Sequence, residues 1–178
     1  MKIVVGLGNF GERYADTFHN MGFLAVSFLS ERLHIKLKTR ECASLTGVGS
    51  FGGERLVLAQ PQTYMNLSGQ AVKALMAKYK ASASDVLVLF DDIDIPRGTV
   101  RYRQSGSGGT HNGMRNVIAE CGTEAFARVR IGIGRPPQNM PLADYVLASV
   151  PYEDRAVLKE AINTACDETE RWLRGEKK

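Results

Sequence analysis

The run Asp85-Val-Leu-Val-Leu-Phe90 constrains the fold more than any other stretch of this sequence. Its apolar residues are contiguous, and two aspartates, Asp91 and Asp92, follow it. A short apolar run bounded by polar residues is typical of a strand that is buried on both faces. A second such run, Lys2–Leu7, opens the chain and leads into a glycine-bearing turn. The sequence therefore predicts a sheet with a buried centre.

Strand-like and helical segments alternate along the rest of the chain, which is typical of an α/β layer fold. Further strands are expected over residues 43–51, 55–60, 99–103 and 129–133, and helices over residues 14–33, 68–79, 114–121 and 153–173. Ser68 is the expected cap of the second helix. Because Gly52-Gly53-Glu54 joins two strands as a hairpin, the sheet is expected to be mixed. Ligands of such sheets gather at the carboxyl ends of the strands.

The length and the cysteines bound the class of protein. A chain of 178 residues predicts one domain, spanning residues 1–178. Three widely spaced cysteines, Cys42, Cys121 and Cys166, argue against a disulfide framework and against a zinc site, and favour a reducing, cytoplasmic location. We expect neither a signal peptide nor a membrane span, since no apolar run approaches about 20 residues.

Positive charge is concentrated in one stretch of the chain. Residues 97–135 hold seven arginines against two acidic residues, whereas the whole chain has a net charge of +4. A local basic surface suits a partner that bears phosphates. A solvated charged face with no partner explains the same composition.

The segment Gly6-Leu-Gly-Asn-Phe-Gly11 matches the dinucleotide-binding pattern G-x-G-x-x-G between a strand and a helix. That pattern also needs an acidic residue about 20 positions further on, at the end of a second strand. Here Glu31 lies within the expected helix, and the next strand leads into a hairpin. A tight turn that presents the side chain of Asn9 explains the glycines equally well.

Two histidines, His19 and His111, each precede an asparagine in a polar stretch that glycine borders. Taken singly, each is well explained as a structural residue. Asp91, at the end of a buried strand, would accept the Nδ1–H of an imidazole and favour its proton-accepting tautomer. We therefore expect His19 to act as a general base supported by Asp91, and the sequence leaves open whether His111 acts chemically or structurally.

Three asparagines, Asn9, Asn66 and Asn112, are expected around a scissile bond, because an amide side chain donates to a developing oxyanion and accepts from an N–H group. The sequence contains no G-x-S-x-G nucleophile turn and no H-E-x-x-H metal motif. We therefore expect direct attack by water, with no metal and no cofactor.

Five ordered motifs resemble those of bacterial peptidyl-tRNA hydrolases. They occupy residues 5–23, 60–69, 91–98, 108–113 and 128–136, so the resemblance covers the chain from about residue 2 to residue 150. It implies a twisted mixed β-sheet flanked by helices on both sides, in a monomer that hydrolyses the ester between a peptide, or an N-blocked aminoacyl group, and tRNA.

The resemblance also implies a role for each matching residue. His19 is the general base, Asp91 favours its basic form, and Asn9 helps to distinguish blocked from free aminoacyl ends. Residues that line the site for the peptide and the terminal adenosine are Tyr14, Tyr64, Met65, Asn66, His111 and Asn112. Arg103 and Arg130 fall where the family places basic residues near tRNA phosphates.

Several positions depart from the family pattern. Phe10 stands where proline is usual, and Gln60, Gln138 and Asn139 stand where lysine is frequent. These departures leave the strength of the contacts with the tRNA body open. Two rival functions remain at this stage: an enzyme that uses a nucleotide cofactor, and an RNA-binding protein without catalysis.

Overall fold

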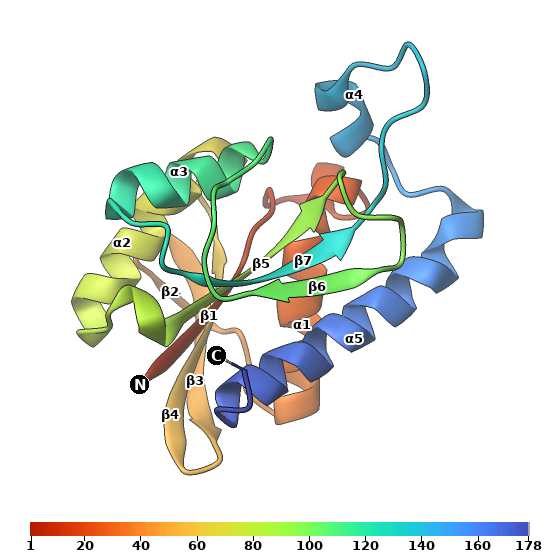
Figure 1. The fold of residues 1–178 in the computed structure, drawn as a ribbon. Coiled ribbons are helices and arrows are strands. Elements are labelled where there is room, and N and C mark those ends of the chain that lie inside the picture. The colour runs from red at the N-terminus through yellow and green to blue at the C-terminus, as the bar shows by residue number, and fades with distance from the viewer. Residues whose placement is uncertain (178) are drawn as a thin grey trace.

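The computed structural model describes residues 1–177, which fold around a seven-stranded sheet (Figure 1). The strand order is β2-β3-β4-β1-β5-β7-β6. Strands β4, β1, β5 and β7 are parallel neighbours at the centre, and antiparallel pairs form both edges. The strands are β1 (Lys2–Gly6), β2 (Thr39–Glu41), β3 (Ser44–Phe51), β4 (Glu54–Pro61), β5 (Val86–Asp92), β6 (Val100–Arg103) and β7 (Ala127–Gly132). The prediction of a mixed sheet is confirmed.

Helices cover both faces of the sheet, as predicted. They are α1 (Met21–Leu33), α2 (Ser68–Tyr79), α3 (Asn112–Cys121), α4 (Leu142–Val146) and α5 (Arg155–Leu173). In Figure 1, α2 and α3 lie on one side of the sheet, and α1 and α5 lie on the other. Because successive strand residues point to opposite faces, β5 serves two cores: Leu87 and Leu89 pack toward α1 and α5, whereas Val88 and Phe90 pack toward α2 and α3. This explains its contiguous apolar sequence.

The first helix begins later than the sequence predicted. Two short 3-10 turns, Glu12–Tyr14 and Phe18–Asn20, precede α1, which starts at Met21 and not near residue 14. The extended backbone of Thr17 separates the turns, and Thr17 forms an isolated antiparallel bridge with Ser149. A contact that is distant in sequence therefore overrides the local helical preference.

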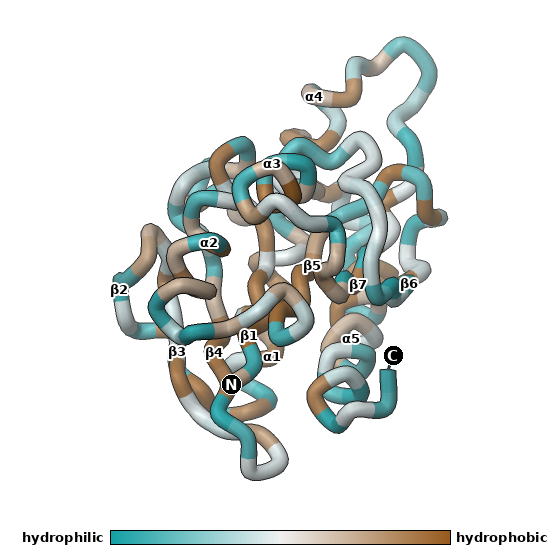
Figure 2. The backbone as a smooth tube through the Cα atoms, turned by 60° about the vertical axis from the view of Figure 1, so that its left-hand side comes forward, coloured by the Kyte–Doolittle hydropathy of each residue, from teal (hydrophilic) through white to brown (hydrophobic). Residues whose placement is uncertain are grey.

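Two other predictions about the helices need correction. Ser68 is the first residue of α2 and not its cap, and its hydroxyl donates to the carbonyl of Met65 at 2.8 Å. The long tail helix begins at Arg155, after a 3-10 turn over Tyr152–Asp154. The short elements β2 and α4 were not predicted. In Figure 2, the loop that leads to α4 is hydrophilic, whereas α4 itself is largely hydrophobic.

Two glycines let α1 pack very closely on the centre of the sheet. A Cβ atom on Gly6 would lie 2.1 Å from the carbonyl oxygen of Gly22, and one on Gly22 would lie 2.3 Å from that of Leu89. No side chain fits at such distances. This close contact sets the position of the segment just before Gly22, which carries His19, at the carboxyl ends of β1 and β5. Within residues 1–177, every helix falls short of the length and apolarity that a membrane span requires.

Candidate active site

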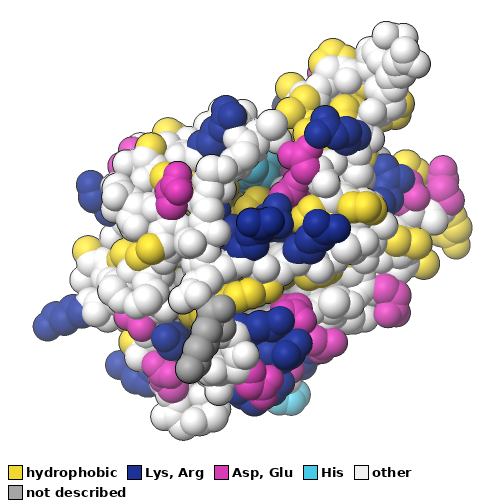
Figure 3. Space-filling model, viewed as in Figure 1, with side chains coloured by type: hydrophobic (Ala, Val, Ile, Leu, Met, Phe, Trp, Pro, Cys, Tyr) yellow, Lys and Arg dark blue, Asp and Glu magenta, His cyan; other side chains and the backbone are white. Residues whose placement is uncertain are grey.

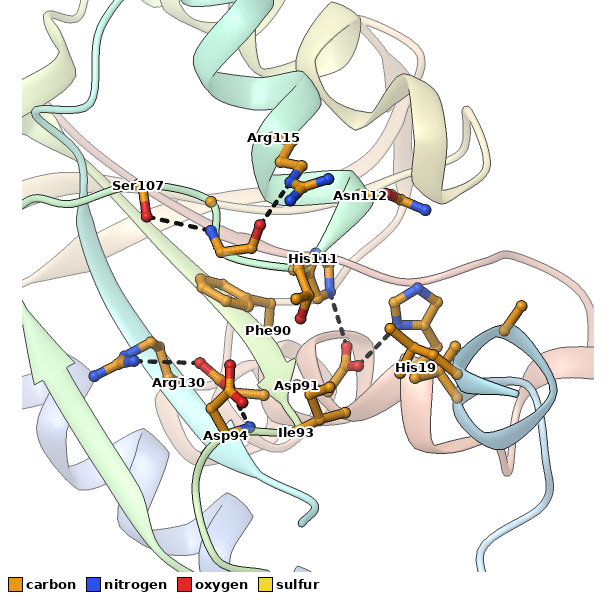
Figure 4. A pocket seen from close by; sticks show the side chains of 17 residues that line it. His19, Phe90, Asp91, Ile93, Asp94, Ser107, His111, Asn112, Arg115 and Arg130 are labelled. Carbon is orange, nitrogen blue, oxygen red and sulfur yellow. Dashed lines mark hydrogen bonds and ion pairs between the residues drawn. The ribbon is translucent and has the colours of Figure 1, made fainter. Parts of the chain in front are cut away.

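Asp91 lies at the centre of a hydrogen-bonded group formed by three segments distant in sequence. Its side chain is 2% exposed at the carboxyl end of β5. One carboxylate oxygen lies 2.8 Å from Nδ1 of His19, and the other lies 3.0 Å from Nε2 of His111. Figure 4 shows both imidazoles converging on this carboxylate. The structure therefore brings together the three titratable residues that the sequence singled out.

The hydrogen bonds of His111 determine its tautomer. His111 is the N-cap of α3, and its Nδ1 accepts the backbone N–H of Met114 at 3.1 Å. An acceptor nitrogen carries no proton in the neutral ring, so Nε2 carries it and donates to Asp91. Both ring nitrogens are thus engaged within the protein. This arrangement favours the structural alternative for His111, because no ring nitrogen remains to exchange a proton with a substrate.

His19 differs because only one of its nitrogens is held by Asp91. With Nδ1–H donating to the carboxylate, Nε2 is left as the acceptor. Burial by itself would lower the pKa of His19, but the negative charge of Asp91 and its hydrogen bond outweigh burial, and the pKa is raised above its usual value. The negative charge of Asp91 and the ring orientation that its hydrogen bond imposes therefore both suit a proton acceptor at Nε2 of His19.

The same contacts keep Asp91 ionised. Burial would raise the pKa of this carboxyl group, but the charges of His19 and His111 and their hydrogen bonds outweigh it and hold the pKa far below its usual range. A buried carboxylate that accepts from two imidazoles remains negative across the neutral range, so it supports His19 without itself exchanging a proton.

A cavity of about 490 Å³ opens beside this group. In Figure 3, a histidine side chain is visible in a hollow that Lys, Arg, Asp and Glu side chains border. The glycine-rich segment 107–112 and the residues after β5 form parts of the wall, and apolar residues of α4 form another part: Leu142, Ala143 and Val146. The apolar α4 wall was not predicted, because the sequence of this short helix carries no periodic signal.

Asn9 lies in the loop after β1, and its side chain is held in one orientation. Its Oδ1 accepts the backbone N–H of Met65 at 2.7 Å, which leaves the amide Nδ2 as a free donor. The side chain of Asn20 holds the backbone of Asn9 from both sides, accepting from its N–H and donating to its carbonyl, each at 2.8 Å. Sequence reasoning missed Asn20, although its position directly after His19 was a signal.

Of the other predicted binding residues, Asn112 and Arg130 line this cavity, whereas its lining does not include Tyr14, Tyr64, Met65, Asn66 and Arg103. Asn66 and Asn112 are exposed, and Met65 is buried against α3, where the missing side chain of Gly113 makes room for its sulfur. Tyr64 is 51% exposed and adopts a positive φ of 63°, a conformation that few residues other than glycine adopt. Its ring stacks on Phe10 at 4.4 Å and meets the edge of Tyr14 at 6.4 Å.

Not every arginine of the arginine-rich stretch lies on the surface or is free of an acidic partner. Arg128 is 1% exposed and donates to three backbone carbonyls, those of Ser107, Glu124 and Phe126. It therefore ties the glycine-rich loop to the start of β7. Three further arginines form ion pairs with carboxylates: Arg97 with Asp154, Arg130 with Asp92, and Arg135 with Asp94.

The exposed part of the basic stretch is smaller. Arg101 and Arg103 are exposed on β6, and Arg115 is exposed on α3, where it donates to the carbonyl of Gly109. Gln60, which replaces a frequent lysine, is 7% exposed and donates to the carbonyl of Phe23 on α1. Because the Gln60 side chain is buried, it contributes almost nothing to the exposed surface of the protein.

His19, Asp91 and His111 also have the ligand types of a metal site, and their ligand atoms lie within 4.8 Å of one another. A metal at this position would need unprotonated nitrogens on both rings. The backbone donor of Met114 places the proton of His111 on Nε2, facing the carboxylate. The geometry therefore suits a chain of hydrogen bonds better than it suits metal coordination.

Known proteins resemble this chain over nearly its full length. A family profile described as Peptidyl-tRNA hydrolase matches residues 3–178. The peptidyl-tRNA hydrolase of Chloroflexus aurantiacus is 48% identical over 175 residues, 98% of this chain and 93% of that protein. That of Brevibacillus brevis is 41% identical over 174 residues, 98% of this chain and 92% of that protein. The crystal structure of peptidyl-tRNA hydrolase from Acinetobacter baumannii superposes with a TM-score of 0.93 at 33% identity, over 99% of this chain and 90% of that one.

Proposed function

Because the chain belongs to the peptidyl-tRNA hydrolase family, whose members hydrolyse the ester between a peptide and tRNA, we propose that His19 activates the attacking water. One observation carries this proposal: Nδ1 of His19 is held by the buried carboxylate of Asp91 at 2.8 Å, which leaves Nε2 as an acceptor at the catalytic cavity. A positioned general base contributes about 10²–10⁴ in rate.

The reaction follows from these positions. Nε2 of His19 takes a proton from water as the water oxygen attacks the ester carbonyl. Asp91 stabilises the imidazolium that results, and the same proton then passes to the ribose oxygen as the ester bond breaks. Free tRNA and a peptide with a new carboxyl group leave. No covalent enzyme intermediate is needed, because an ester has a moderately good leaving group.

We assign the side-chain amides of Asn9, Asn66 and Asn112 to the acyl group. Since Met65 occupies Oδ1 of Asn9, the Nδ2 group of Asn9 is the one available to the substrate, and it would donate to a carbonyl of a blocked aminoacyl end. A free amino group offers no such acceptor. Asn66 and Asn112 would donate to the reacting carbonyl and hold the water, and the rings of Tyr14 and Tyr64 would contact the peptide or the terminal adenosine.

Arg103 and Arg130 are the proposed phosphate contacts. Arg103 is exposed on β6 and suits a direct contact. Arg130 is half-buried and paired with Asp92 at 3.3 Å, so a phosphate would have to compete with that carboxylate. We therefore assign the larger contribution to Arg103.

The decisive experiment compares the release of tRNA from N-acetylaminoacyl-tRNA and from unblocked aminoacyl-tRNA. We expect wild-type protein to cleave only the blocked substrate, and His19→Ala to lose nearly all turnover while its tRNA affinity is retained. If wild-type protein bound tRNA but released none, the protein would be an RNA-binding relative without catalysis. If His19→Ala kept near-normal turnover, another base would have to act.

We further propose that the enzyme acts as a monomer, without a metal ion, in the cytoplasm. In support, every side chain of the proposed mechanism comes from one chain, and hydrogen bonds occupy the atoms that would bind a metal. Sedimentation should give the mass of one chain, 19.5 kDa, and turnover should survive treatment with a chelator. Loss of activity with EDTA, restored by a divalent metal, would overturn the metal-free mechanism.

A further inference from the structure

Arg97 connects several segments at the base of α4. It lies in the loop between β5 and β6. Its Nε donates to the carbonyl of Ile133 at 3.0 Å, and its two terminal nitrogens donate to Asp154 and to the hydroxyl of Tyr145, each at 2.7 Å. The guanidinium also lies over the ring of Phe18, 5.1 Å from its centroid. Its planar set of donors suits such a junction better than the single ammonium of lysine would.

These contacts involve both sides of the catalytic cavity. Phe18 immediately precedes His19, and its ring packs on Tyr145 of α4 with centroids 4.8 Å apart. The backbone just after α4 pairs with the segment before His19: the N–H of Phe18 donates to Ala148, and the N–H of Val150 donates to Asp16. The hydroxyl of Tyr145 donates in turn to the carbonyl of Ile133 at 2.6 Å.

α4 is attached to the body of the protein through Tyr145 and Val146, which are buried in the core on the α1 and α5 side of the sheet, and through the partly buried Leu142. It projects from the main body at the end of a hydrophilic loop (Figures 1 and 2). Tyr145 is its most buried residue, at 3% exposure, whereas Leu147 just beyond the helix is 43% exposed. One face of α4, with Leu142, Ala143 and Val146, lines the catalytic cavity. The position of this apolar wall therefore depends on the packing of Val146 and Leu142 and on the polar contacts around Tyr145.

We propose that Arg97 is a positioning residue for substrate binding: it fixes the α4 wall relative to His19 and so sets the width of the catalytic cavity. This inference rests on the proposed function, because it assigns the cavity to the acyl group of the substrate. Arg97 then acts through Tyr145 and Phe18 and has no contact with the reacting atoms. Its loss would weaken substrate binding more than it would slow the chemical step.

An alternative role for Arg97 is direct attraction of tRNA phosphate, and Asp154→Asn separates the two. That variant removes a carboxylate and leaves the charge of Arg97 unpaired. If Arg97 attracts phosphate, Asp154→Asn should lower KM. If Arg97 positions α4, the variant should raise KM, because one of the contacts that hold the guanidinium is lost.

The test measures kcat and KM on N-acetylaminoacyl-tRNA for wild type, Arg97→Ala, Arg97→Lys, Tyr145→Phe and Asp154→Asn. We expect Arg97→Ala to raise KM about 5–10-fold while kcat stays within about twofold, since misplaced binding groups reduce affinity before they alter a base that remains in place. Arg97→Lys should recover part of the loss, and Tyr145→Phe and Asp154→Asn should each raise KM about 2–4-fold. The matched control is Arg32→Ala, which breaks an arginine–aspartate pair of the same 2.7 Å length between α1 and α5 and should leave both constants unchanged.

Amide hydrogen exchange over residues 140–150 gives a readout that does not depend on activity. Exchange should be faster in Arg97→Ala and in Asp154→Asn than in wild type and in Arg32→Ala. The proposal is overturned if Asp154→Asn lowers KM, if Arg97→Ala changes kcat and not KM, or if exchange over this segment is unchanged. If Arg97→Ala does not fold, the other three variants decide. If wild-type protein shows no turnover, the proposed function fails while the exchange data still decide whether Arg97 holds α4.

Discussion

At the scale of single residues, one buried carboxylate organises the site. Asp91 accepts from Nδ1 of His19 and from Nε2 of His111, and the second nitrogens of these two imidazoles have different partners. For His111 the partner of the second nitrogen is the backbone N–H of Met114. The second nitrogen of His19 has no hydrogen-bond partner among residues 1–177, and His19 lines the cavity. The helix cap therefore leaves the two histidines with different hydrogen-bonding capacity: His111 has no free ring nitrogen, whereas His19 has one.

Asp91→Asn tests the electrostatic support of His19. The base form of His19 is the neutral ring, so activity should rise with pH through its pKa, which Asp91 raises. The amide removes the negative charge while burial remains, and burial lowers the pKa. The acid limb of the kcat/KM profile should therefore move to lower pH, and kcat should fall roughly 10²-fold, because the tautomer and the imidazolium lose their support. An acid limb that stays in place would assign it to another group.

His111→Asn separates the helix cap from the contact with Asp91. Asparagine retains an acceptor for the N-terminal turn of α3 but is too short to reach the carboxylate as the imidazole does. We expect the free energy of unfolding in urea to change by no more than about 1 kcal/mol, and kcat/KM to fall roughly tenfold because Asp91 loses one of its two donors. Unchanged kcat/KM would limit His111 to capping.

Part of the site could be predicted at this scale, and part could not. Asp91 and Asn9 follow the two apolar runs, and His19 and Asn112 lie in polar stretches bordered by glycine, so the sequence itself singled them out. The burial of Arg128 could not be predicted, because its partners are three backbone carbonyls and no residue type signals a carbonyl. The role of Asn20 depends in the same way on the backbone of Asn9.

At the scale of secondary-structure elements, the contact of α1 with β1 and β5 positions His19. Gly22→Ala should therefore affect both stability and activity. The added Cβ would lie 2.3 Å from the carbonyl oxygen of Leu89, so α1 must move away from the sheet. We expect a loss of roughly 1–3 kcal/mol in unfolding free energy, with a lower kcat because His19 moves relative to Asp91.

Gly53→Ala is the matched control for this glycine. It lies in the hairpin turn between β3 and β4, where a Cβ would meet no neighbour, although its φ of 83° makes alanine strained. We expect it to lower stability by about 1 kcal/mol and to leave kcat unchanged. An equal loss of kcat in both variants would show that α1 does not position the base.

The elements that could be predicted are those whose own apolar residues form a run or a stripe that has to be buried. The five-residue apolar run of β5 permits hardly any other structure, and the apolar stripe of α5 fixes its buried face. The start of α1 could not be predicted, because Thr17 is held extended by a bridge to Ser149, far along the chain. The short elements α4 and β2 likewise depend on neighbours and carry little signal of their own.

At the scale of the whole molecule, ion pairs and burial reduce the basic surface to fewer arginines than the sequence suggests. Arg103→Ala should raise KM at moderate salt and reduce the slope of log KM against log salt by roughly 0.7–0.9, the amount expected for one phosphate contact. Arg128→Ala should instead lower stability and leave the salt slope unchanged, because its charge is buried. Identical salt slopes for wild type and Arg103→Ala would place the tRNA on another face.

The order of the strands has a consequence for how the chain acquires its structure during synthesis. β1 comes first in the sequence, yet it lies between β4 and β5 in the sheet. The other neighbour of β5 is β7, which comes later still in the sequence. Pairing between such distant segments is slow compared with the formation of local structure. Until residue 132 has left the ribosome, β5, which carries Asp91, has an unpaired edge. The residues around Asp91 therefore reach their final arrangement only after β7 has been made.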